Sequence, residues 1–411
     1  MKHPIERIKG SKSRLLENKK IVLCVTGSIA AIESPKLARE LVRHGADVYS
    51  VMSPSAREII HPNAMEFATG KRVITKLTGL VEHVSLAGDL PEKADLILVA
   101  PCTANTLSKI ASGIDDTSVT TVVSTAIGSS IPILIAPAMH ESMYKHPSIQ
   151  ENIEKIKKMN IYLVEPRIEE EKAKIANITD IVEKVIEILY KDKDLSGKKI
   201  LITVGPTIEP VDPIRIITNK SSGLMGISLA KAALARGGDV TIVYGPGTVR
   251  PPLCKVINVN TTSEMYDAVK KETESNKFDI FIGAAAAADF CCEGEERKIS
   301  STKESLVVKL KRTPKIVDYV RSFDKNIFLV GFKAEYDVSD EELIERAYER
   351  LKSVDMDMIV ANDVSREGVG FGTPTNEVFI IDKEKKVEHI PLTNKLEVAH
   401  RILDSILSHL R

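Results

Sequence analysis

The sequence lacks features that would mark several classes of protein. It carries no net charge, because 57 lysine and arginine residues balance 57 aspartate and glutamate residues. This balance does not favour nucleic acid or a membrane surface as the main partner. No apolar run is long enough to span a bilayer, and no GxxxxGK(S/T) motif is present, which excludes a P-loop enzyme. The proportions of hydrophobic (43%) and charged (28%) residues are ordinary for a soluble globular protein.

Cysteine is also scarce. The five cysteines are odd in number and scattered, which favours a reducing compartment and a cytoplasmic location. Cys291 and Cys292 are adjacent and have no matching ligand pair, so a metal cage is not expected. The first twenty residues are basic but have no apolar core for export. We therefore expect residues 1–18 to be an N-terminal extension that forms a flexible lead-in.

The chain contains the same alternation of apolar strands and helical patterns twice. The strand at Ile21–Val25 and the near-continuous apolar run Ala94–Ala100 have counterparts at Ile200–Val204 and Phe278–Ala285. The charged segment Lys191–Lys199 separates the two rounds. This order predicts two tandem, doubly wound α/β domains with mostly parallel sheets of the Rossmann or flavodoxin-like kind, over residues 19–190 and 191–411. The later elements expected are strands at Leu306–Leu310, Ile327–Gly331, Met358–Ala361 and Val378–Ile381 and a closing helix at Asn394–Leu410.

Small residues follow the predicted strands of the first half. Gly27-Ser28 stands between a strand and a helix, with one glycine in place of the three of a dinucleotide fingerprint. A single phosphate, as in FMN, suits this loop better than NAD. Ser53, Thr103 and Asn105 follow other strands and would add hydrogen-bond donors. Ligands of such sheets bind beyond the carboxyl ends of the strands, so we expect these residues to meet there.

The second half has a much longer first loop. Lys198–Gly226 comprises a strand, a turn, a long polar loop that includes Asn219, and then Ser221-Ser222-Gly223 before an alanine-rich helix. Long ordered loops are usually functional, and such a strand–loop–helix junction presents backbone N–H groups to an anion. The run Gly283–Asp289 (GAAAAAD) ends a later strand, and its small residues let a ligand approach the backbone. Its Asp289 is a candidate for a ribose hydroxyl or a divalent cation.

Three motifs of the first half resemble the flavin-dependent cysteine decarboxylases: Gly27–Ala31 (GSIAA), Ala100–Thr106 (APCTANT) and Pro137–Tyr144 (PAMHESMY). In that family FMN accepts a hydride from the cysteine side chain, which permits loss of CO₂, and then returns it. The resemblance implies that His83 is the catalytic histidine. It also implies substrate binding by Met139, His140 and Lys172.

The first half departs from that family at three places. His140 and Tyr144 replace an asparagine and a tryptophan. The stretch Glu165–Lys174 corresponds to a flap that carries a cysteine in bacterial relatives, and it contains none. Either another acid serves, with Lys172, Lys174 and Cys102 as candidates, or the substrate alone organises the flap.

The second half resembles phosphopantothenate–cysteine ligases. The stretch Gly205–Gly226 fits GPTxEPxDPxRxIxNxSSGxMG, and AAxADF, GFxAE and ANDVS follow it. Together the two halves resemble the bifunctional coenzyme A biosynthesis family, in an archaeal-type form, over roughly residues 18–410. The resemblance implies that 4′-phosphopantothenate and CTP give an acyl-nucleotide, which cysteine converts to the amide, with Mg²⁺ or Mn²⁺ as the cation. The decarboxylase half would then act on 4′-phosphopantothenoylcysteine to give 4′-phosphopantetheine.

The same resemblance assigns residues of the second half. Asn219 would engage the acyl-nucleotide, Lys298 would neutralise charge during its formation, and Asp289 would hold the metal. The phosphopantothenate would contact Asn219, Ser221, Ser222 and Gly223. The positions expected to contact the nucleotide are Gly283, Ala284, Ala285, Asp289, Lys298, Pro314, Lys315, Ile316, Val317, Phe332 and Arg350.

Lysines of relatives are changed at two places in the second half. Ser300 and Ser301 follow Lys298, so positive charge is lost there or moved to Lys303. Arg350 and Lys352 stand where relatives carry two lysines, and arginine does not simply replace lysine at a phosphate.

Two alternatives remain open. The first is an active ligase joined to a flavin-binding domain without catalytic activity, which the missing flap cysteine supports. The second is a tandem NAD(P)-dependent oxidoreductase, against which the single-glycine loop argues. Family analogy also implies a homo-oligomer, with trimers through the flavin half, dimers through the ligase half and a dodecamer by their combination.

Overall fold

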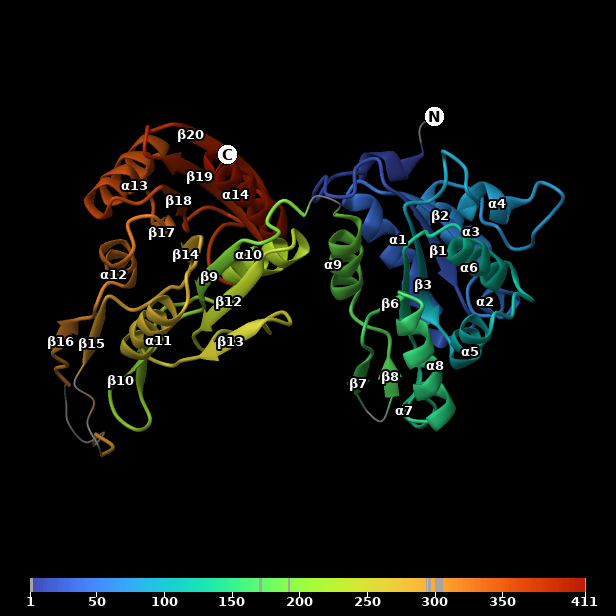
Figure 1. The fold of residues 1–411 in the computed structure, drawn as a ribbon, viewed down its shortest axis with the longest axis horizontal. Coiled ribbons are helices and arrows are strands. Elements are labelled where there is room, and N and C mark those ends of the chain that lie inside the picture. The colour runs from blue at the N-terminus through green and yellow to red at the C-terminus, as the bar shows by residue number, and fades with distance from the viewer. Residues whose placement is uncertain are drawn as a thin grey trace. The chain divides into compact units, whose positions relative to one another are not determined.

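The computed structural model describes residues 3–169, 172–190, 193–292, 294, 297–299 and 306–410. The chain divides into two compact units, Met1–Lys191 and Asp192–Arg411 (Figure 1). Among the described residues, no helix is long and apolar enough to cross a membrane. Lys303, where the lost positive charge was expected to reappear, lies outside the described residues.

The sheet of the first unit is entirely parallel. Its spatial order is β2-β1-β3-β4-β6, which is the flavodoxin-like order once the strands are counted along the chain. Every residue of β3 is buried, as expected for a strand covered on both faces. The bounds are β1 Lys20–Val25, β2 Asp47–Met52, β3 Leu96–Cys102, β4 Ile133–Pro137 and β6 Tyr162–Leu163.

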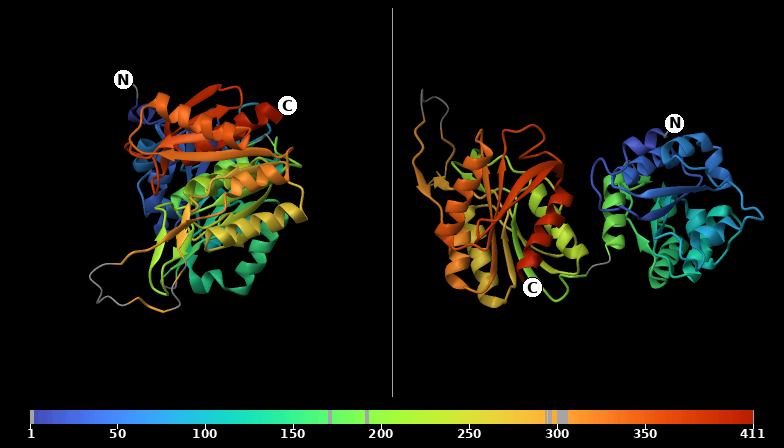
Figure 2. Two further views of the ribbon diagram at one scale, coloured as in Figure 1. Left: turned by 90° about the vertical axis from the view of Figure 1, so that its left-hand side faces the viewer. Right: turned by 90° about the horizontal axis from the view of Figure 1, so that it is seen from above.

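Helices cover both faces of this sheet (Figure 2). The helix α1 packs against α3 and α9, while α5 packs against α6 and α8, and α6 against α4. The bounds are η2 Ile29–Glu33, α1 Ser34–Arg43, α2 Pro54–Arg57, α3 Pro62–Thr69, α4 Glu82–Ala87, α5 Ala104–Ser112, α6 Ser118–Gly128, α7 Glu141–Tyr144, α8 Pro147–Lys158 and α9 Ile178–Leu189. A small antiparallel sheet of β5 (Met139–His140), β8 (Lys172–Lys174) and β7 (Arg167–Glu169) completes the unit.

The N-terminal segment is not the flexible lead-in that its composition predicted. Ile5 and Leu16 are buried. Ser13 Oγ lies 2.7 Å from Nδ1 of the buried His44, and Lys9 Nζ lies 2.9 Å from Asp47 Oδ1. The prediction was wrong because two apolar residues among many basic ones suffice to fix the segment on the unit.

The main sheet of the second unit has eight strands in the order β13-β12-β9-β14-β17-β18-β19-β20. Counted along the chain, the first six follow the Rossmann order, and β19 and β20 add an antiparallel hairpin. The predicted fold class is therefore confirmed for both halves. The bounds are β9 Lys199–Val204, β12 Asp239–Tyr244, β13 Lys255–Asn258, β14 Ile280–Gly283, β17 Phe328–Glu335, β18 Met358–Asp363, β19 Thr375–Asp382 and β20 Val387–Asn394.

One predicted strand is misplaced. Residues 306–309 are not in a strand, and β16 (Leu310–Arg312) pairs with β15 (Phe290–Cys292) outside the main sheet. The apolar residues Leu306, Val307 and Val308 suggested a sheet strand, but the residues of β16 are exposed. A second small ribbon joins β10 (Ile208–Pro210) to β11 (Ile216–Thr218) within the long first loop.

The helices of the second unit again lie on both faces of the sheet (Figure 2). The helices α10 and α14 pack together, while α12 contacts both α11 and α13. The bounds are α10 Leu224–Ala235, α11 Thr262–Ser275, α12 Ile316–Phe323, α13 Asp340–Val354 and α14 Lys395–Leu410.

From Lys193 onward, the segment between the two halves is part of the second unit. Arg236, whose exposed fraction is 2%, donates to both carboxylate oxygens of Asp194, at 2.8 and 2.6 Å. The same guanidinium donates to Asp404 at 2.6 Å and to the backbone oxygen of His400 at 3.1 Å. Leu195 is fully buried. A buried charge of this kind is tolerated because its donors find acceptors.

Candidate functional site

The first unit contains a cavity of about 440 Å³ beyond the carboxyl ends of its strands. Ser28, Ser53, Thr103 and Thr117 line it, and each is an N-cap residue whose side-chain oxygen accepts a backbone N–H of the helix that follows. Helix N-termini carry partial positive charge and leave backbone donors for an anion. The cavity is thus suited to a phosphate group.

All the residues predicted to bind FMN line this cavity: Gly27, Ser28, Ser53, Thr103 and Asn105. A Cβ added to Gly27 would lie 2.4 Å from Ser55 Cβ, so a side chain there cannot be accommodated without a shift. The fit of small and hydroxyl-bearing residues to a flavin phosphate is therefore good. Ser55, Thr106, Lys109, Thr117 and Thr120 also line the cavity and were missed. Of these, Thr117 could have been found from the sequence, because a threonine before a helix is a typical N-cap residue.

The predicted substrate segment of the first unit lies beside the flap. In the β5–β8 pairing, Met139 is opposite Ala173 and His140 is opposite Lys172. Met139 lines the cavity, whereas His140 is exposed and its Nδ1 caps α7 by accepting the Ser142 N–H at 3.3 Å. Tyr144 donates to Glu165 at 3.1 Å, and burial together with this carboxylate raises the pKa of Tyr144 to about 12.

Two other candidate residues do not line the cavity. His83 is on α4 and does not line the cavity in a single chain. Its Nδ1 is buried and has no hydrogen-bond partner among the described residues. Cys102 is fully buried in β3, and burial raises the pKa of its thiol. That raised pKa makes Cys102 a poor replacement for the missing flap cysteine.

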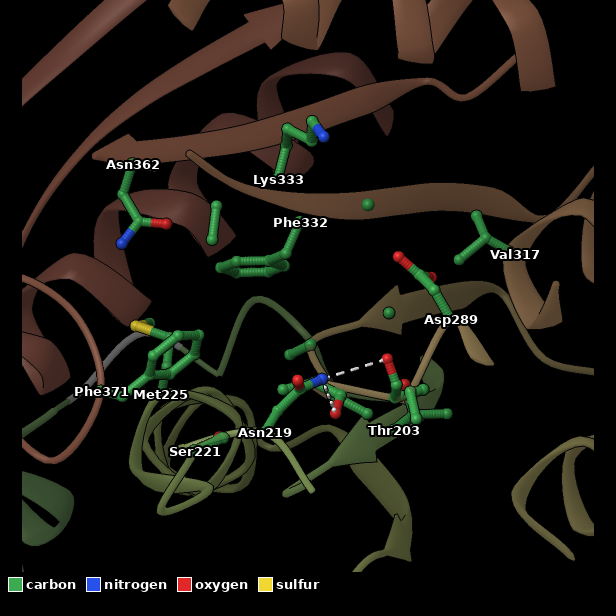
Figure 3. Close-up of a pocket in the computed structure, with 18 of the residues that line it drawn as sticks. Thr203, Asn219, Ser221, Met225, Asp289, Val317, Phe332, Lys333, Asn362 and Phe371 are labelled. Atoms are coloured by element: carbon green, nitrogen blue, oxygen red, sulfur yellow. Dashed lines mark hydrogen bonds between the residues drawn. The ribbon is translucent and has the colours of Figure 1, made fainter. Parts of the chain in front are cut away.

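The second unit contains a larger cavity of about 640 Å³ beyond the ends of β9, β14 and β17 (Figure 3). It lies where the strand order reverses between β9 and β14, the usual ligand position in such sheets. The predicted site residues that line it are Asn219, Ser221, Ser222, Gly283, Ala284, Ala285, Asp289, Pro314, Lys315, Ile316, Val317, Phe332 and Arg350.

Asn219 is held in a fixed orientation within this cavity. Its Nδ2 donates to the backbone oxygen of Ala286 at 2.9 Å and to that of Ala287 at 3.4 Å (Figure 3). The amide nitrogen is therefore engaged with the alanine-rich loop, and Oδ1 is the atom turned away from those two carbonyl oxygens. This geometry gives the Asn219 side chain one defined way to meet a ligand.

A buried polar network shapes the alanine-rich loop. Thr207 Oγ1 accepts the backbone N–H of Ala288 at 2.9 Å, and Thr313 Oγ1 donates to the backbone oxygen of Ala288 at 2.6 Å. Thr262 Oγ1 lies 2.8 Å from Thr207 Oγ1 and donates to Glu209 at 2.8 Å. All four side chains are buried. A network satisfied in this way rigidifies the backbone that faces the cavity.

Two basic residues of the cavity wall are paired with acids. Lys315 Nζ lies 2.5 Å from Asp289 Oδ1, and Arg350 lies 2.5 Å from Asp318. No group of three or more acidic, histidine or cysteine side chains among the described residues could hold a metal ion by itself. Asp289 therefore suits the kind of Mg²⁺ site in which one carboxylate and the substrate phosphates together provide the ligands.

Lys298 does not line the cavity in a single chain. The residue after it, Ile299, is bound by the buried carboxylate of Asp212. Asp212 accepts backbone N–H groups from Ile214 at 2.8 Å, Arg215 at 2.7 Å and Ile299 at 3.1 Å. Burial would raise the pKa of Asp212, but these donors and the Arg215 guanidinium outweigh it and lower the pKa to about 2. Asp212 thus joins the long first loop to the residue that follows Lys298.

Two further predicted residues lie outside the cavity lining. Gly223 has a φ of +81° and is the N-cap residue of α10, so it shapes the turn. Lys352 lies 4.7 Å from the centre of the Tyr348 ring. Residues that line the cavity and were not predicted include Thr203, Lys333, Asn362, Asn376 and Lys395. Only Asn362 carried a signal, as part of the ANDVS motif.

The fold and the two cavities define a two-unit α/β protein with one switch-point site in each unit. The first unit matches the model of the flavoprotein family over residues 9–190. The second matches the DNA/pantothenate metabolism flavoprotein C-terminal domain over residues 195–410.

Full-length relatives define the family. The chain is 48% identical over 406 residues to the coenzyme A biosynthesis bifunctional protein CoaBC of Thermococcus kodakarensis, with 99% of each chain covered. It is 43% identical to the CoaBC of Methanocaldococcus jannaschii, with 98% of this chain and 97% of that one covered, and 34% identical to the CoaBC of Bacillus subtilis, with 95% and 97% covered. The chain belongs to the CoaBC family of bifunctional coenzyme A biosynthesis enzymes, which confirms the resemblance predicted from the motifs.

Proposed function

We propose that the second unit joins 4′-phosphopantothenate to cysteine with CTP and that the first unit decarboxylates the product with FMN. The observation that carries this proposal is the cavity of about 640 Å³ in which Asn219, the two serines after it, the alanine-rich loop and Phe332 meet. A single cavity that combines anion-binding turns with a close backbone approach suits two anionic substrates that must react with each other.

In the ligase reaction, a carboxylate oxygen of phosphopantothenate attacks the α-phosphorus of CTP, and pyrophosphate leaves. The amine of cysteine then attacks the acyl carbon, CMP leaves and the amine proton is released. Asn219 Oδ1 is oriented by the two backbone contacts of Nδ2 and contacts the acyl-nucleotide. Asp289 would hold Mg²⁺ or Mn²⁺, which would offset the negative charge of the reacting phosphates, and Lys298 would neutralise charge at the α-phosphorus.

In the decarboxylase reaction, FMN supplies the reversible two-electron oxidation of the substrate's thiol-bearing carbon. The N-cap residues Ser28, Ser53 and Thr103 hold its phosphate at the helix N-termini. Met139 and His140 bind the substrate from β5, in which His140 is paired with Lys172 of β8. His83 moves the thiol proton.

The position of His83 supports a homo-oligomeric flavin unit. His83 is absent from the cavity lining, so a neighbouring subunit would bring it to the flavin. Leu80, next to α4, is 81% exposed, and Ile29, next to the flavin loop, is 74% exposed. Exposed apolar residues on both sides fit a subunit interface. Trimers through this unit and dimers through the ligase unit are the expected assembly, and a cytoplasmic location is expected from the five free cysteines.

A product assay tests the proposal. The purified protein is incubated with phosphopantothenate, cysteine and either CTP or ATP, and pyrophosphate and CO₂ are followed together. We expect pyrophosphate release with CTP exceeding that with ATP, followed by CO₂ release from a yellow, FMN-containing protein. Pyrophosphate without CO₂ would support the alternative of an active ligase joined to a non-catalytic flavin domain. Absence of pyrophosphate with either nucleotide would overturn the ligase assignment.

A further inference from the structure

The last helix contributes a buried lysine to the ligase cavity. Lys395 is the first residue of α14, its exposed fraction is 4%, and it lines the cavity together with Gly370, Phe371 and Asn376. Its Nζ donates to the backbone oxygen of Gly370 at 2.8 Å. None of the reactions described above uses this ammonium group.

The charge of Lys395 is not balanced by an acid. Among the described residues no carboxylate forms an ion pair with it, whereas the two acids of the cavity wall have other partners: Asp289 pairs with Lys315 and Glu335 pairs with Lys333. Lysine is rarely buried without a counter-charge, because desolvation disfavours the charged form. Burial accordingly lowers the pKa of Lys395 to about 8. The N-terminus of α14 adds positive potential at the same point.

The ammonium lies on the side of the cavity away from Asp289 and Val317, two of the expected nucleotide positions. Figure 3 shows Asn362 and Phe371 toward one side of the cavity and Asp289 and Val317 toward the other. The hydrogen bond to Gly370, the neighbour of Phe371, puts Lys395 on the first side. An anion that meets this lysine therefore belongs to the part of the ligand that extends away from Asp289 and Val317.

We propose that Lys395 Nζ binds the phosphate monoester of 4′-phosphopantothenate. This inference rests on the ligase function proposed above and adds a residue to its substrate site. A phosphate offers several acceptor oxygens to the ammonium and supplies the missing negative charge. The amide of Asn376, which is also buried and lines the cavity, is a second polar group at this end.

The competing explanation is that Lys395 has a purely structural role and only stabilises the loop around Gly370 through its hydrogen bond. The two explanations differ in their effect on the free protein. If Lys395 is structural, removing it lowers the melting temperature. If Lys395 is a buried charge without a counter-ion, removing it leaves the melting temperature unchanged or raises it. They also differ in their dependence on the substrate's phosphate.

The test uses full-length Lys395→Met, which keeps the length of the side chain and removes its charge. Pyrophosphate release is measured in three series, in which the concentration of phosphopantothenate, of CTP or of pantothenate is varied. Pantothenate lacks the phosphate. We expect the KM for phosphopantothenate to rise by about tenfold or more, as for a lost charge-assisted hydrogen bond. We expect the KM for CTP to change by less than about twofold, and activity with pantothenate to be no worse than in the unmodified protein.

Several results would overturn the proposal. A raised KM for CTP with an unchanged KM for phosphopantothenate would assign Lys395 to the nucleotide. Equal losses with phosphopantothenate and pantothenate, together with a lower melting temperature, would assign it to the loop. Calorimetric binding of phosphopantothenate to both proteins keeps the test independent of turnover: weaker binding to Lys395→Met supports the proposal even if no ligation occurs, and equal binding refutes it. If Lys395→Met does not fold, Lys395→Gln, which can still donate to Gly370, is measured instead.

Discussion

The two units place their cavities at the same point of two similar sheets and build them from different parts. In the first unit the connection after β1 is short, Thr26–Ser28, and helix caps from four connections surround the cavity. In the second unit the connection after β9 runs from Gly205 to Gly223, forms its own ribbon and carries Asn219 into the cavity. The sheet therefore fixes where a ligand lies, and the length of the first loop decides which chemistry is present.

Neither cavity is lined by all of its predicted catalytic residues within one chain. Asn219 lies in the second cavity with its amide already fixed by two backbone contacts. His83 lies outside the lining of the first cavity, and Lys298 lies outside that of the second. Each unit thus has one predicted catalytic residue outside its cavity lining, and each prediction below tests one of the two units.

The largest effect is expected from His83→Asn. Decarboxylation should fall by about a thousandfold, since general acid–base catalysis contributes roughly 10²–10⁴-fold, and pyrophosphate release should be unchanged. CO₂ and pyrophosphate are measured in the same assay. His61→Asn is the matched control, because His61 is an exposed N-cap residue whose capping role asparagine can fill. Loss of both activities in His83→Asn would contradict the division of labour between the units.

Asn219→Asp should have the next largest effect and act only on the second unit. An aspartate cannot donate to the Ala286 oxygen and brings negative charge beside the carbonyl groups of the loop. We expect amide formation to fall by about a hundredfold, with the flavin absorption spectrum unchanged. Asn326→Asp, at an exposed position, serves as the control for added charge. Near-normal amide formation in Asn219→Asp would remove Asn219 from the intermediate.

Asp212→Asn should slow pyrophosphate release by about tenfold through Lys298. Asparagine keeps an acceptor for Ile214 and Arg215 but loses the carboxylate oxygen that Ile299 uses. In a double-mutant cycle with Lys298→Gln, which should itself severely slow acyl-nucleotide formation, the effect of Asp212→Asn should largely disappear. Additive losses would show that Asp212 acts on something other than Lys298.

Gly27→Ala in the short loop of the first unit should weaken flavin binding. The added Cβ would lie 2.4 Å from Ser55 Cβ, so the backbone or Ser55 must shift. Overpacking of this kind costs about 1–3 kcal/mol, which corresponds to roughly five- to hundredfold weaker flavin binding. Fluorescence titration with FMN measures it. Gly79→Ala is the control, because nothing lies within 4 Å of its added Cβ. Unchanged affinity in Gly27→Ala would argue that the flavin phosphate lies elsewhere.

Much of the fold follows from the sequence because periodicity and turn residues are local signals. The restart of the strand pattern near Lys198 predicted the second sheet, and the residues after each buried strand predicted most of both cavities. The prediction of a sheet strand at Leu306–Leu310 failed because a short apolar run can also precede an exposed ribbon strand such as β16. The N-terminal segment failed because the burial of Ile5 depends on distant elements.

The parts of the site that could not be predicted are supplied by tertiary structure. Lys395 begins a helix whose sequence resembles ordinary closing structure, and only the folded chain brings it beside Gly370. The anchoring of the Lys298 loop by Asp212 joins residues that are 87 positions apart. Such pairings leave no periodic trace in the sequence, because they arise from the packing of loops and not from a repeated pattern of side chains.

The contact between Asp194 and Arg236 limits where the gene can be divided. A separate second half that begins before Lys193 keeps the carboxylate that accepts from Arg236. One that begins after Leu195 loses the Asp194 carboxylate, and breaking a buried ion pair by removing one partner costs about 3–5 kcal/mol. Two-plasmid complementation by separated halves should therefore tolerate a cut between residues 190 and 193 and fail a few codons later.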